Sequence, residues 1–414
     1  MNENSSKKLY IATVGTGTSG EDIAHALYFS INDKNPDTAV FILSKKTKDE
    51  TYPFIEERLK TDKPNLIYYP KLVEEVNEFE VLHKAYLSLI KEYVKQGYKT
   101  KNIVLDYTSG TKSMSAALVS AGIAAEVGLI SYTYGTRGEG GRVKSGSERI
   151  TSLSTNLFNT ERKISQAITL FNKYLFDAAE EILASFDDIP HPDYEYRIKF
   201  IASLSQALSN WDKFNFNSAS EELKSISEDE NLVNEAKSFG VGINKLIQAT
   251  NFLKEKKLNF YKVIELISNA KRRAKEGKYD DSIARLYRAI EMIGQIEFER
   301  EFKCDTSDVL IQNIPTEFIE EIKTKYYDAK DGKVKLPLFA TFDLLNKVKN
   351  NIGNRFFNNF EKIKKVLHLR NNSILAHGIR PLNEKEFNEA LLLVEDLLKE
   401  TETIIDIPNL PVLR

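Results

Sequence analysis

The chain has 414 residues, of which 42% are hydrophobic and 29% are charged, so it is long enough for two or three globular domains. Its 58 Lys and Arg residues nearly balance its 60 Asp and Glu residues, which excludes a globally basic nucleic-acid-binding protein and leaves only a local patch for such contacts. The single cysteine, Cys304, excludes an internal disulfide and a cysteine-based metal cluster, and the five histidines argue against a structural zinc site.

The first 150 residues alternate strand-like and helix-like segments. Short apolar runs predict strands at "KLYIATVG", "TAVFILS", "PNLIYYPKL", "KNIVLDYTSG" and "LISYTYG". Helical spacing follows the first run in "EDIAHALYFSI", a long helix is expected over 74–96, and "TKSMSAALVSAGIAAEVG" predicts a helix of small residues. The alternation predicts an α/β Rossmann-like domain, with a parallel sheet buried on both faces. The glycine-rich segment "GTRGEGGRVKSGSERI" then indicates a flexible hairpin or exit loop.

From about residue 157 the pattern becomes entirely helical. A lysine, an aromatic residue, a short spacer and an amphipathic helix recur from Lys173, Lys213 and Lys278, which indicates helical hairpins. The intervals between them are unequal, which excludes a regular solenoid. "FDDIPHPDY", at 186–194, is the best candidate for an internal break. We therefore expect a Rossmann-like domain over 1–155, an all-α connector over 156–260 and an all-α bundle over 261–414.

The last block predicts a helical bundle. "YDDSIARLYRAIEMIGQIEFEREF" indicates a long helix, and "LFATFDLLNKV", "KIKKVLHLRNNSILAHG" and "EKEFNEALLLVEDLLKETETII" indicate three more, whereas "GNRFFNNFEKIKK" is typical of an exposed turn. Arg285 and Arg288 lie one turn apart, and we expect Arg285 and Glu291 to form a buried structural ion pair rather than to approach a site. The apolar stripe of the long helix comprises Ile283, Leu286, Ile290 and Ile293.

Residues 13–20, "TVGTGTSG", place Gly15, Gly17 and Gly20 in a G-x-G-x-x-G pattern between a strand and a helix. Such a loop presents backbone N–H groups at a helix N-terminus, where anions bind. A dinucleotide site also needs a carboxylate after the second strand, yet that strand ends in "FILSKK". This argues against NAD, although Ser44 and the lysines could accept the extra phosphate of NADP. A tight turn that needs glycine for its backbone angles is the purely structural alternative.

A second loop with many hydroxyl groups, "LDYTSGTKSMSAAL", follows a later strand and opens its helix. Because ligands of such sheets bind beyond the carboxyl ends of the strands, we expect both loops to face one pocket. The segment lacks the Walker A pattern, which argues against an ATPase. Lys112 opposes the dipole of the helix that it opens, and this cost favours a ligand role over that of a solvated lysine.

Near the C-terminus, "RNNSILAHG" sets Arg370 and His377 seven positions apart, so that on one helix they would share a face. With Asn371 and Ser373 nearby, they form a candidate metal-independent ribonuclease pair. His377 could move a proton at the 2′-hydroxyl or the leaving 5′-oxygen, and Arg370 could stabilise the phosphorane. The approach "EKIKKVLHLR" offers a local basic surface for RNA. The alternative is a surface arginine and a helix-end histidine before a C-cap, Gly378.

The two N-terminal loops resemble the ligand loops of CARF domains, the CRISPR-associated Rossmann fold, over about residues 7–150. The R-x(4–6)-H pattern in an all-helical C-terminal domain resembles HEPN ribonucleases, and the whole chain resembles the CARF–HEPN ribonucleases of type III CRISPR systems. The resemblance implies cyclic oligoadenylate as allosteric activator, with four or six adenylates, and no metal or other cofactor. It also implies a homodimer with a composite active site that cleaves single-stranded RNA and leaves a 2′,3′-cyclic phosphate.

Carried over to this sequence, the resemblance implies two sets of site residues. The catalytic residues would be Arg370, His377 and Asn371. The residues that bind cyclic oligoadenylate would be Gly15, Thr16, Gly17, Thr18, Ser19, Asp106, Thr108, Ser109, Gly110, Thr111, Lys112 and Met114.

Two other functions stay open at this point. One is a non-catalytic CARF sensor whose helical part docks a partner, and the other is an NADP-dependent oxidoreductase, which leaves Arg370 and His377 unexplained. Cleavage of the ligand itself also stays open, because no general base accompanies Thr111 and Lys112. No apolar run reaches the ~20 residues of a membrane span, and the start "MNENSSKKLY" lacks the apolar core of a signal peptide. We therefore expect a cytoplasmic protein without a membrane partner.

Overall fold

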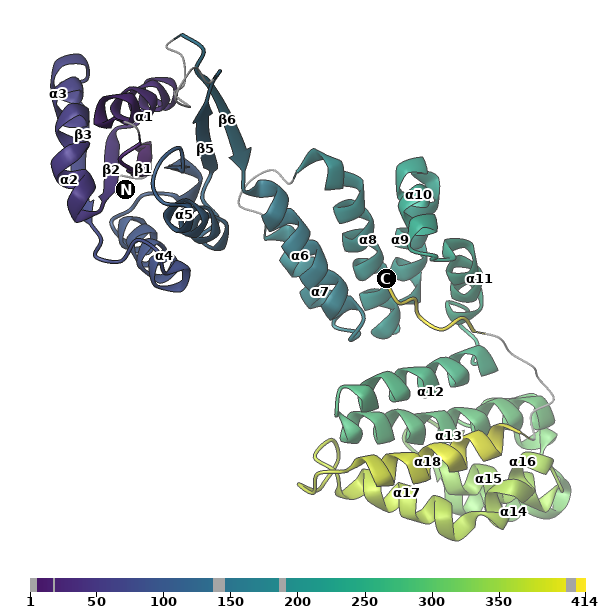
Figure 1. Ribbon diagram of the computed structural model, residues 1–414. Helices are drawn as coiled ribbons and strands as arrows, with labels where there is room; N and C mark the ends of the chain where they lie inside the picture. Colours follow the sequence, from purple (N-terminus) through teal and green to yellow (C-terminus); the bar gives the residue numbers. More distant parts are fainter. Residues whose placement is uncertain (1–5, 18, 137–145, 186–190, 400–406) are drawn as a thin grey trace. The chain divides into compact units, whose positions relative to one another are not determined.

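The computed structural model describes residues 6–17, 19–136, 146–185, 191–399 and 407–414 (Figure 1). The chain divides into two compact units. The first comprises Met1–Ile164 with Phe186–Tyr194, and the second comprises Ser165–Ser185 with Glu195–Arg414. The first holds a six-stranded sheet, whereas the second is built mainly from helices.

The sheet of the first unit has the strand order β3-β2-β1-β4-β5-β6. Its strands are β1 (Leu9–Thr13), β2 (Thr38–Leu43), β3 (Ile67–Leu72), β4 (Ile103–Asp106), β5 (Leu129–Tyr134) and β6 (Arg149–Ser154). The first five are parallel, and β6 pairs antiparallel with β5. This topology confirms the predicted Rossmann-like α/β domain. Of the segment predicted as a hairpin or exit loop, 137–145 lie outside the described residues and the end forms the start of β6.

Helices cover both faces of this sheet. They are α1 (Gly20–Lys34), α2 (Lys45–Glu50), α3 (Tyr52–Asp62), α4 (Phe79–Lys95) and α5 (Lys112–Ala124), with a short 3-10 turn, η2 (Thr100–Asn102). Because side chains alternate along a strand, Leu9 and Ile11 of β1 pack with α4 and α5, whereas Tyr10 and Ala12 pack with α1 and α3. Strands β1, β2 and β4 are buried along their whole length, as predicted, whereas β5 contains the buried Ser131 and Thr133 and ends at the exposed Tyr134.

Two expectations for this unit are wrong in detail. Strand β3 is not buried on both faces: Ile67, Tyr69 and Leu72 are exposed, because this edge strand has a neighbour on one side only. The helix expected over 74–96 begins only at Phe79. The Glu75 carboxylate accepts hydrogen bonds from three successive backbone N–H groups, at 2.6–3.0 Å, and so stabilises a turn before the helix.

The connector consists of paired helices, of which α6 spans the division between the two units. They are α6 (Asn156–Phe171), α7 (Phe176–Ala184), α8 (Glu195–Asp212), α9 (Phe216–Glu228), α10 (Glu230–Ser238) and α11 (Ile243–Leu253), with the 3-10 turn η4 (Pro192–Tyr194) before α8. Of the break predicted at 186–194, 186–190 lie outside the described residues.

The recurring lysine–aromatic pattern marks the turns of helical hairpins, as predicted. Tyr174 and Phe214 have φ angles of 63° and 62°, a left-handed conformation that is uncommon for an aromatic residue. Their rings pack against those of Phe176 and Phe216, with centroids 6.2 and 5.2 Å apart, which stabilises the turns. In the third copy Gly277 takes the left-handed position instead, with a φ of 75°.

The bundle is centred on α13, which packs against α12, α15, α17 and α18. Its elements are α12 (Phe260–Lys275), α13 (Tyr279–Phe302), η5 (Ile311–Asn313), α14 (Thr316–Tyr326), β7 (Tyr327–Asp328), β8 (Lys333–Val334), α15 (Leu338–Lys347), α16 (Asn351–Asn358), α17 (Phe360–Asn372) and α18 (Glu384–Leu398). The predicted stripe of α13 is fully buried in the core. The expected helical bundle is therefore present.

The segment "GNRFFNNFEKIKK" was expected to be an exposed turn, and this expectation is wrong. It contains most of α16, which Asn350 caps through its side chain, and the start of α17. Ile352 and Phe356 are buried, and the Phe356 ring stacks on Phe342 with centroids 4.0 Å apart. A Cβ on Gly353 would lie 2.4 Å from a backbone nitrogen of α15, so this close helix crossing requires glycine.

The C-terminal segment returns to the connector. Leu410 and Leu413 are buried, and the Asn172 side chain bonds both the N–H and the carbonyl of Leu413, at 2.9 and 2.8 Å. Within the described residues, no helix is long and apolar enough to cross a membrane.

Candidate ligand-binding and catalytic sites

The loop between β1 and α1 carries the predicted glycine motif. Gly17 has a φ of 57°, a conformation that favours glycine. A Cβ on Gly15 would lie 2.6 Å from the backbone nitrogen of Gly110, so glycine is needed where the two loops meet. The Ser19 hydroxyl caps α1 by accepting a hydrogen bond of 3.2 Å from a backbone N–H of its first turn. Thr18 lies outside the described residues.

Hydrogen bonds join this loop to the second predicted loop, which follows β4. The Ser109 hydroxyl donates to the Thr13 carbonyl at 2.8 Å and accepts from the Gly15 N–H at 3.1 Å. In return the Thr13 hydroxyl donates to the Ser109 carbonyl. The two loops therefore form one continuous rim at the carboxyl end of the sheet, the place where ligands bind in folds of this kind.

Asp106 supports the second loop from inside the domain. Its carboxylate is fully buried and accepts hydrogen bonds from the Ser30 hydroxyl and, at 2.8 Å, from the Thr108 N–H. Burial raises the pKa of Asp106, and the hydrogen bonds from Ser30 and Thr108 oppose this rise. The sequence reasoning missed Ser30; the signal was a hydroxyl on the buried face of α1, between Leu27 and Ile31.

Four predicted ligand residues have structural roles here. Asp106 and Met114 are buried, so neither side chain reaches the rim. The Ser109 hydroxyl joins the loops, and the Thr111 hydroxyl caps α5 by accepting from the Met114 N–H at 3.1 Å, because a helix N-terminus needs a partner for its free N–H groups. Among the described residues, the predicted ligand residues that are at least partly exposed are Gly15, Thr16, Gly17, Ser19, Thr108, Gly110, Thr111 and Lys112.

Arg370 and His377 do not share a helix, contrary to the sequence expectation. Helix α17 ends at Asn372, and Ser373 has an extended conformation, with φ −77° and ψ 162°. The Ser373 hydroxyl donates to the Arg370 carbonyl at 2.8 Å. The run of two asparagines and a serine thus satisfies the backbone locally and ends the helix.

A closed turn follows α17. The His377 N–H donates to the Asn371 carbonyl at 3.1 Å, and the Gly378 N–H donates to the Ser373 carbonyl at 3.2 Å. A Cβ on Gly378 would lie 2.0 Å from the Asn372 carbonyl oxygen, so Gly378 permits a close approach and is not the helix C-cap that was expected. The turn, rather than helical periodicity, places His377 beside the end of α17.

The two candidate catalytic side chains have different surroundings. The Arg370 guanidinium lies over the Tyr287 ring, 4.9 Å from its centroid, and donates to Asn371 Oδ1 at 3.1 Å. Burial, and then the charge of Glu291, raises the pKa of Tyr287. His377 is exposed, and its side chain has no hydrogen bond or ion pair with any described residue. Sequence reasoning missed Tyr287, because only the fold brings α13 against α17.

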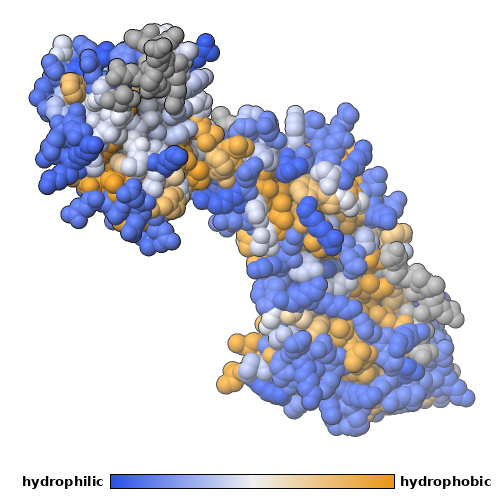
Figure 2. All heavy atoms as spheres, viewed as in Figure 1, coloured by the Kyte–Doolittle hydropathy of each residue, from blue (hydrophilic) through white to orange (hydrophobic). Residues whose placement is uncertain are grey.

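Hydrophobic side chains surround this turn. Ile374, Leu375 and Ile379 are 68%, 54% and 92% exposed. Figure 2 shows hydrophobic residues gathered over the loop that joins α17 to α18. Clustered exposed apolar side chains are typical of a protein–protein contact. In the described part of the chain, no group of three His, Cys, Asp or Glu side chains is arranged to hold a metal ion.

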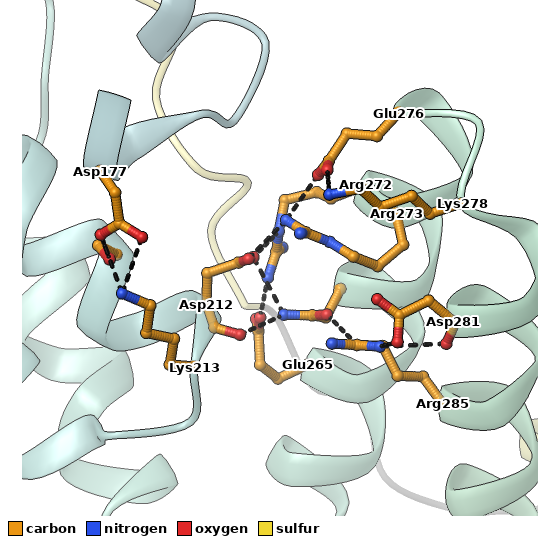
Figure 3. A network of polar contacts seen from close by, with 12 residues as sticks. Asp177, Asp212, Lys213, Glu265, Arg272, Arg273, Glu276, Lys278, Asp281 and Arg285 are labelled. Carbon is orange, nitrogen blue, oxygen red and sulfur yellow. Dashed lines mark hydrogen bonds and ion pairs between the residues drawn. The ribbon is translucent and has the colours of Figure 1, made fainter. Parts of the chain in front are cut away.

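A buried polar network joins the connector to the bundle within the second unit (Figure 3). Asp212, at the end of α8, accepts from Asn269 at 3.0 Å, Arg272 at 2.8 Å and Arg273 at 2.6 Å, all on α12. Arg272 also pairs with Glu265, whose pKa is raised by burial and lowered by the charge of Arg272. Because both charges are buried, each depends on its partner.

Arg285 belongs to this network, which corrects one expectation. It donates to the Asn269 side chain and to Asp281, whereas Glu291 pairs with Arg288 at 3.4 Å. The expected buried pair of Arg285 and Glu291 is therefore wrong. The partners differ because Arg285 faces α12, and its side chain is 26% exposed rather than buried.

Two family models match the helical part of the chain. One, described as the Csm6 HEPN domain, matches residues 250–401, and the other, described as the Csm6 6H domain, matches residues 160–253. Among solved structures, the chain is similar to Csm6 of Enterococcus italicus bound to cyclic hexa-2'-fluoro-hexa-dAMP, with a TM-score of 0.61 and 15% identity, over 95% of this chain and 94% of that chain. No curated protein sequence matches the chain. The two Csm6 models together cover residues 160–401, more than half of the sequence, and the solved structure shows that the fold of the sheet domain is shared as well. The chain therefore belongs to the Csm6 family of CARF–HEPN proteins.

Proposed function

We propose that this chain is a homodimeric endoribonuclease of type III CRISPR defence that requires no metal and cleaves single-stranded RNA when cyclic oligoadenylate binds its CARF domain. The observation that carries the proposal is the group formed by Arg370, Asn371 and His377 at the end of α17, within the region that matches the Csm6 HEPN model. The cyclic hexanucleotide bound to Csm6 of Enterococcus italicus supports the chemical class of the activator.

The rim of the sheet suits the phosphates and riboses of an oligonucleotide. The N-termini of α1 and α5 both meet it, and helix N-termini favour anions. Lys112 adds an exposed positive charge, and the surface position of Thr16 adds a hydroxyl. Gly15 and Gly17 allow a phosphate to approach the backbone closely. A ring of four or six adenylates is the proposed activator.

The proposed reaction needs only proton transfer and charge stabilisation. One His377 imidazole accepts the proton of the 2′-hydroxyl as its oxygen bonds to the adjacent phosphorus. The bond from phosphorus to the 5′-oxygen then breaks, and an imidazolium, supplied by the second copy, protonates the leaving oxygen. The products are a 2′,3′-cyclic phosphate and a 5′-hydroxyl. Arg370 donates to the phosphorane oxygens, and Asn371 orients the guanidinium.

The surroundings of the turn support a site completed by a second copy. The exposed Ile374, Leu375 and Ile379 fit a contact between two bundles, which would bring two Arg370 and His377 pairs together. The activator can favour the active arrangement only to the extent that it binds the active arrangement more tightly than the inactive arrangement.

A cleavage assay tests the proposal. The purified protein is mixed with a quenched fluorescent single-stranded RNA in EDTA, with cyclic tri-, tetra- or hexa-adenylate. We expect one ring size to raise the cleavage rate, and His377→Ala to abolish cleavage while calorimetry shows unchanged ring binding. His191→Ala, which removes a histidine outside the proposed site, should behave as the wild type. Absence of activation by every ring would overturn the proposal, and a protein that binds a ring but never cleaves RNA would be a non-catalytic sensor.

A further inference from the structure

Three tyrosines lie at the carboxyl edge of the sheet, beside the two ligand loops. Tyr107 directly follows β4, and Tyr132 and Tyr134 lie on β5. The register pairs Asp106 with Ser131, so β5 continues past the end of β4 toward the rim. None of the three belongs to the ligand residues inferred from the sequence.

The planes of the three rings are nearly parallel, and neighbouring rings stack on one another. The rings of Tyr107 and Tyr132 have centroids 5.1 Å apart and planes 15° apart, and those of Tyr132 and Tyr134 are 6.3 Å and 9° apart. The backbone fixes this arrangement: the Tyr107 N–H donates to the Ser131 carbonyl at 3.1 Å, and the Thr133 N–H donates to the Thr108 hydroxyl at 2.8 Å. The stack is therefore held by the same hydrogen bonds that hold the second loop.

Exposure of this face increases toward the ligand edge. On β5, alternate residues share a face, and Ile130 is 1% exposed whereas Tyr134 is 42% exposed. Tyr107 and Tyr132 are half-buried. A ring that served only the hydrophobic core would be buried, because core packing covers large aromatic rings. The outermost ring instead presents its surface next to a rim that suits phosphates.

We propose that Tyr107, Tyr132 and Tyr134 form a base-stacking platform that receives an adenine ring of the cyclic oligoadenylate, while the glycine loop binds its phosphates. The inference rests on the proposed function and adds a base subsite to it. Aromatic side chains bind nucleobases by stacking on their faces, and a purine offers the larger surface. The platform thus supplies recognition of the base, which backbone N–H groups and hydroxyls at the loops do not provide.

Fluorescence of a substituted ligand tests the platform. One adenine of the cyclic oligoadenylate that activates the wild type is replaced with 2-aminopurine, whose emission is quenched when it stacks, and the Kd of the unlabelled ring is measured by calorimetry. Tyr134→Phe keeps the ring and should keep both the quenching and a Kd within about two-fold. Tyr134→Leu should lose the quenching and weaken binding about ten-fold, since stacking a base on an aromatic ring gives an effect of this size.

Matched variants separate the outcomes. Tyr69→Leu removes an exposed strand tyrosine at the opposite edge of the sheet and should change neither quantity. Equal quenching and Kd in Tyr134→Leu and the wild type would overturn the platform and leave the proposed function standing. A wild type that binds no cyclic oligoadenylate would overturn both. A Tyr134→Leu protein that loses its dimer in gel filtration, while Tyr134→Phe keeps it, would assign the stack to a contact between copies and overturn the base subsite. Tyr134→Met, which also removes the aromatic ring at this exposed position, repeats the test if Tyr134→Leu does not fold.

Discussion

The rim of the CARF sheet and the turn after α17 hold their polar groups by different means. At the rim, Ser109, Thr13 and Asp106 are buried and joined by hydrogen bonds that fix both loops. At the turn, His377 is exposed, and the neighbouring Ile374 is 68% exposed. The first arrangement exists complete in one chain, whereas the second presents reactive groups and apolar surface together.

This difference bears on how such a protein could be regulated. A ligand site whose loops are already fixed loses little conformational entropy on binding, so it binds tightly without rearranging. A catalytic group without fixed partners is a poor catalyst until something orients it, because acid–base catalysis depends on geometry. Under the proposed function, a second copy and the RNA supply that orientation. Substitutions at the turn should therefore affect catalysis alone, and substitutions in buried networks should affect stability.

After the loss of cleavage in His377→Ala, the largest effect is expected for Arg370→Ala. Removing the guanidinium should lower the activated RNA-cleavage rate by about 10²–10³-fold, as loss of one donor to a developing oxyanion does. Arg370→Lys should retain only part of the wild-type cleavage rate, because an ammonium lacks the planar fork of donors of a guanidinium. The melting temperature should fall by no more than about 5 °C, because the substitution removes only one ring contact and one hydrogen bond. A larger fall in melting temperature would mean that Arg370 stabilises the fold, and would contradict the expectation that substitutions at the turn affect catalysis alone.

Asp212→Ala should destabilise the second unit. The substitution leaves Arg272 buried, with a side chain 7% exposed, and removes one of its two carboxylate partners. Breaking a buried pair in this way costs about 3 kcal/mol or more in free energy of unfolding. The neighbouring Trp211 is the chain's one tryptophan and is buried, so its fluorescence in a urea titration reports this region. Lys213→Ala, at a largely exposed neighbouring pair, is the control and should change stability by less than about 1 kcal/mol.

The fold and the two candidate sites could be predicted only in part from the sequence. The parallel sheet was predictable because β1, β2 and β4 are nearly continuous apolar runs, and the loops because hydroxyls and glycines follow two of them. The end of α17 at Asn372 was not, because helical periodicity continues through "RNNSILAHG" and local hydrogen bonds of Ser373 decide the outcome. Tyr287 and Asn269 were also missed, since each acts through a contact between helices far apart in sequence.

Gly15→Ala tests whether contact between the two loops fixes the ligand rim. Its Cβ would lie 2.6 Å from the Gly110 nitrogen, and that backbone can relieve the clash only by moving the loops apart. Overpacking of this kind costs about 1–3 kcal/mol in free energy of unfolding. Because the loops move apart, the affinity for the activator should also fall, and activated cleavage should recover at saturating ligand. Gly242→Ala, where the nearest atom is 3.7 Å away, is the control. Unchanged affinity in Gly15→Ala would mean that the ligand binds elsewhere.

The smallest effect is expected for Tyr287, whose ring lies under the Arg370 guanidinium at 4.9 Å. Tyr287→Leu should lower kcat about ten-fold with little change in KM, because a partly buried cation–π contact contributes about 1–2 kcal/mol and here orients a group that acts on the transition state. Tyr287→Phe keeps the ring and should retain most of kcat. If catalysis needed the interaction between the Tyr287 hydroxyl and Glu291, Tyr287→Phe would lose kcat as well. Single-turnover cleavage with saturating activator measures this split. A loss in both variants would assign the effect to the hydroxyl, and a loss in neither would show that the second copy and the RNA orient Arg370 without help from α13.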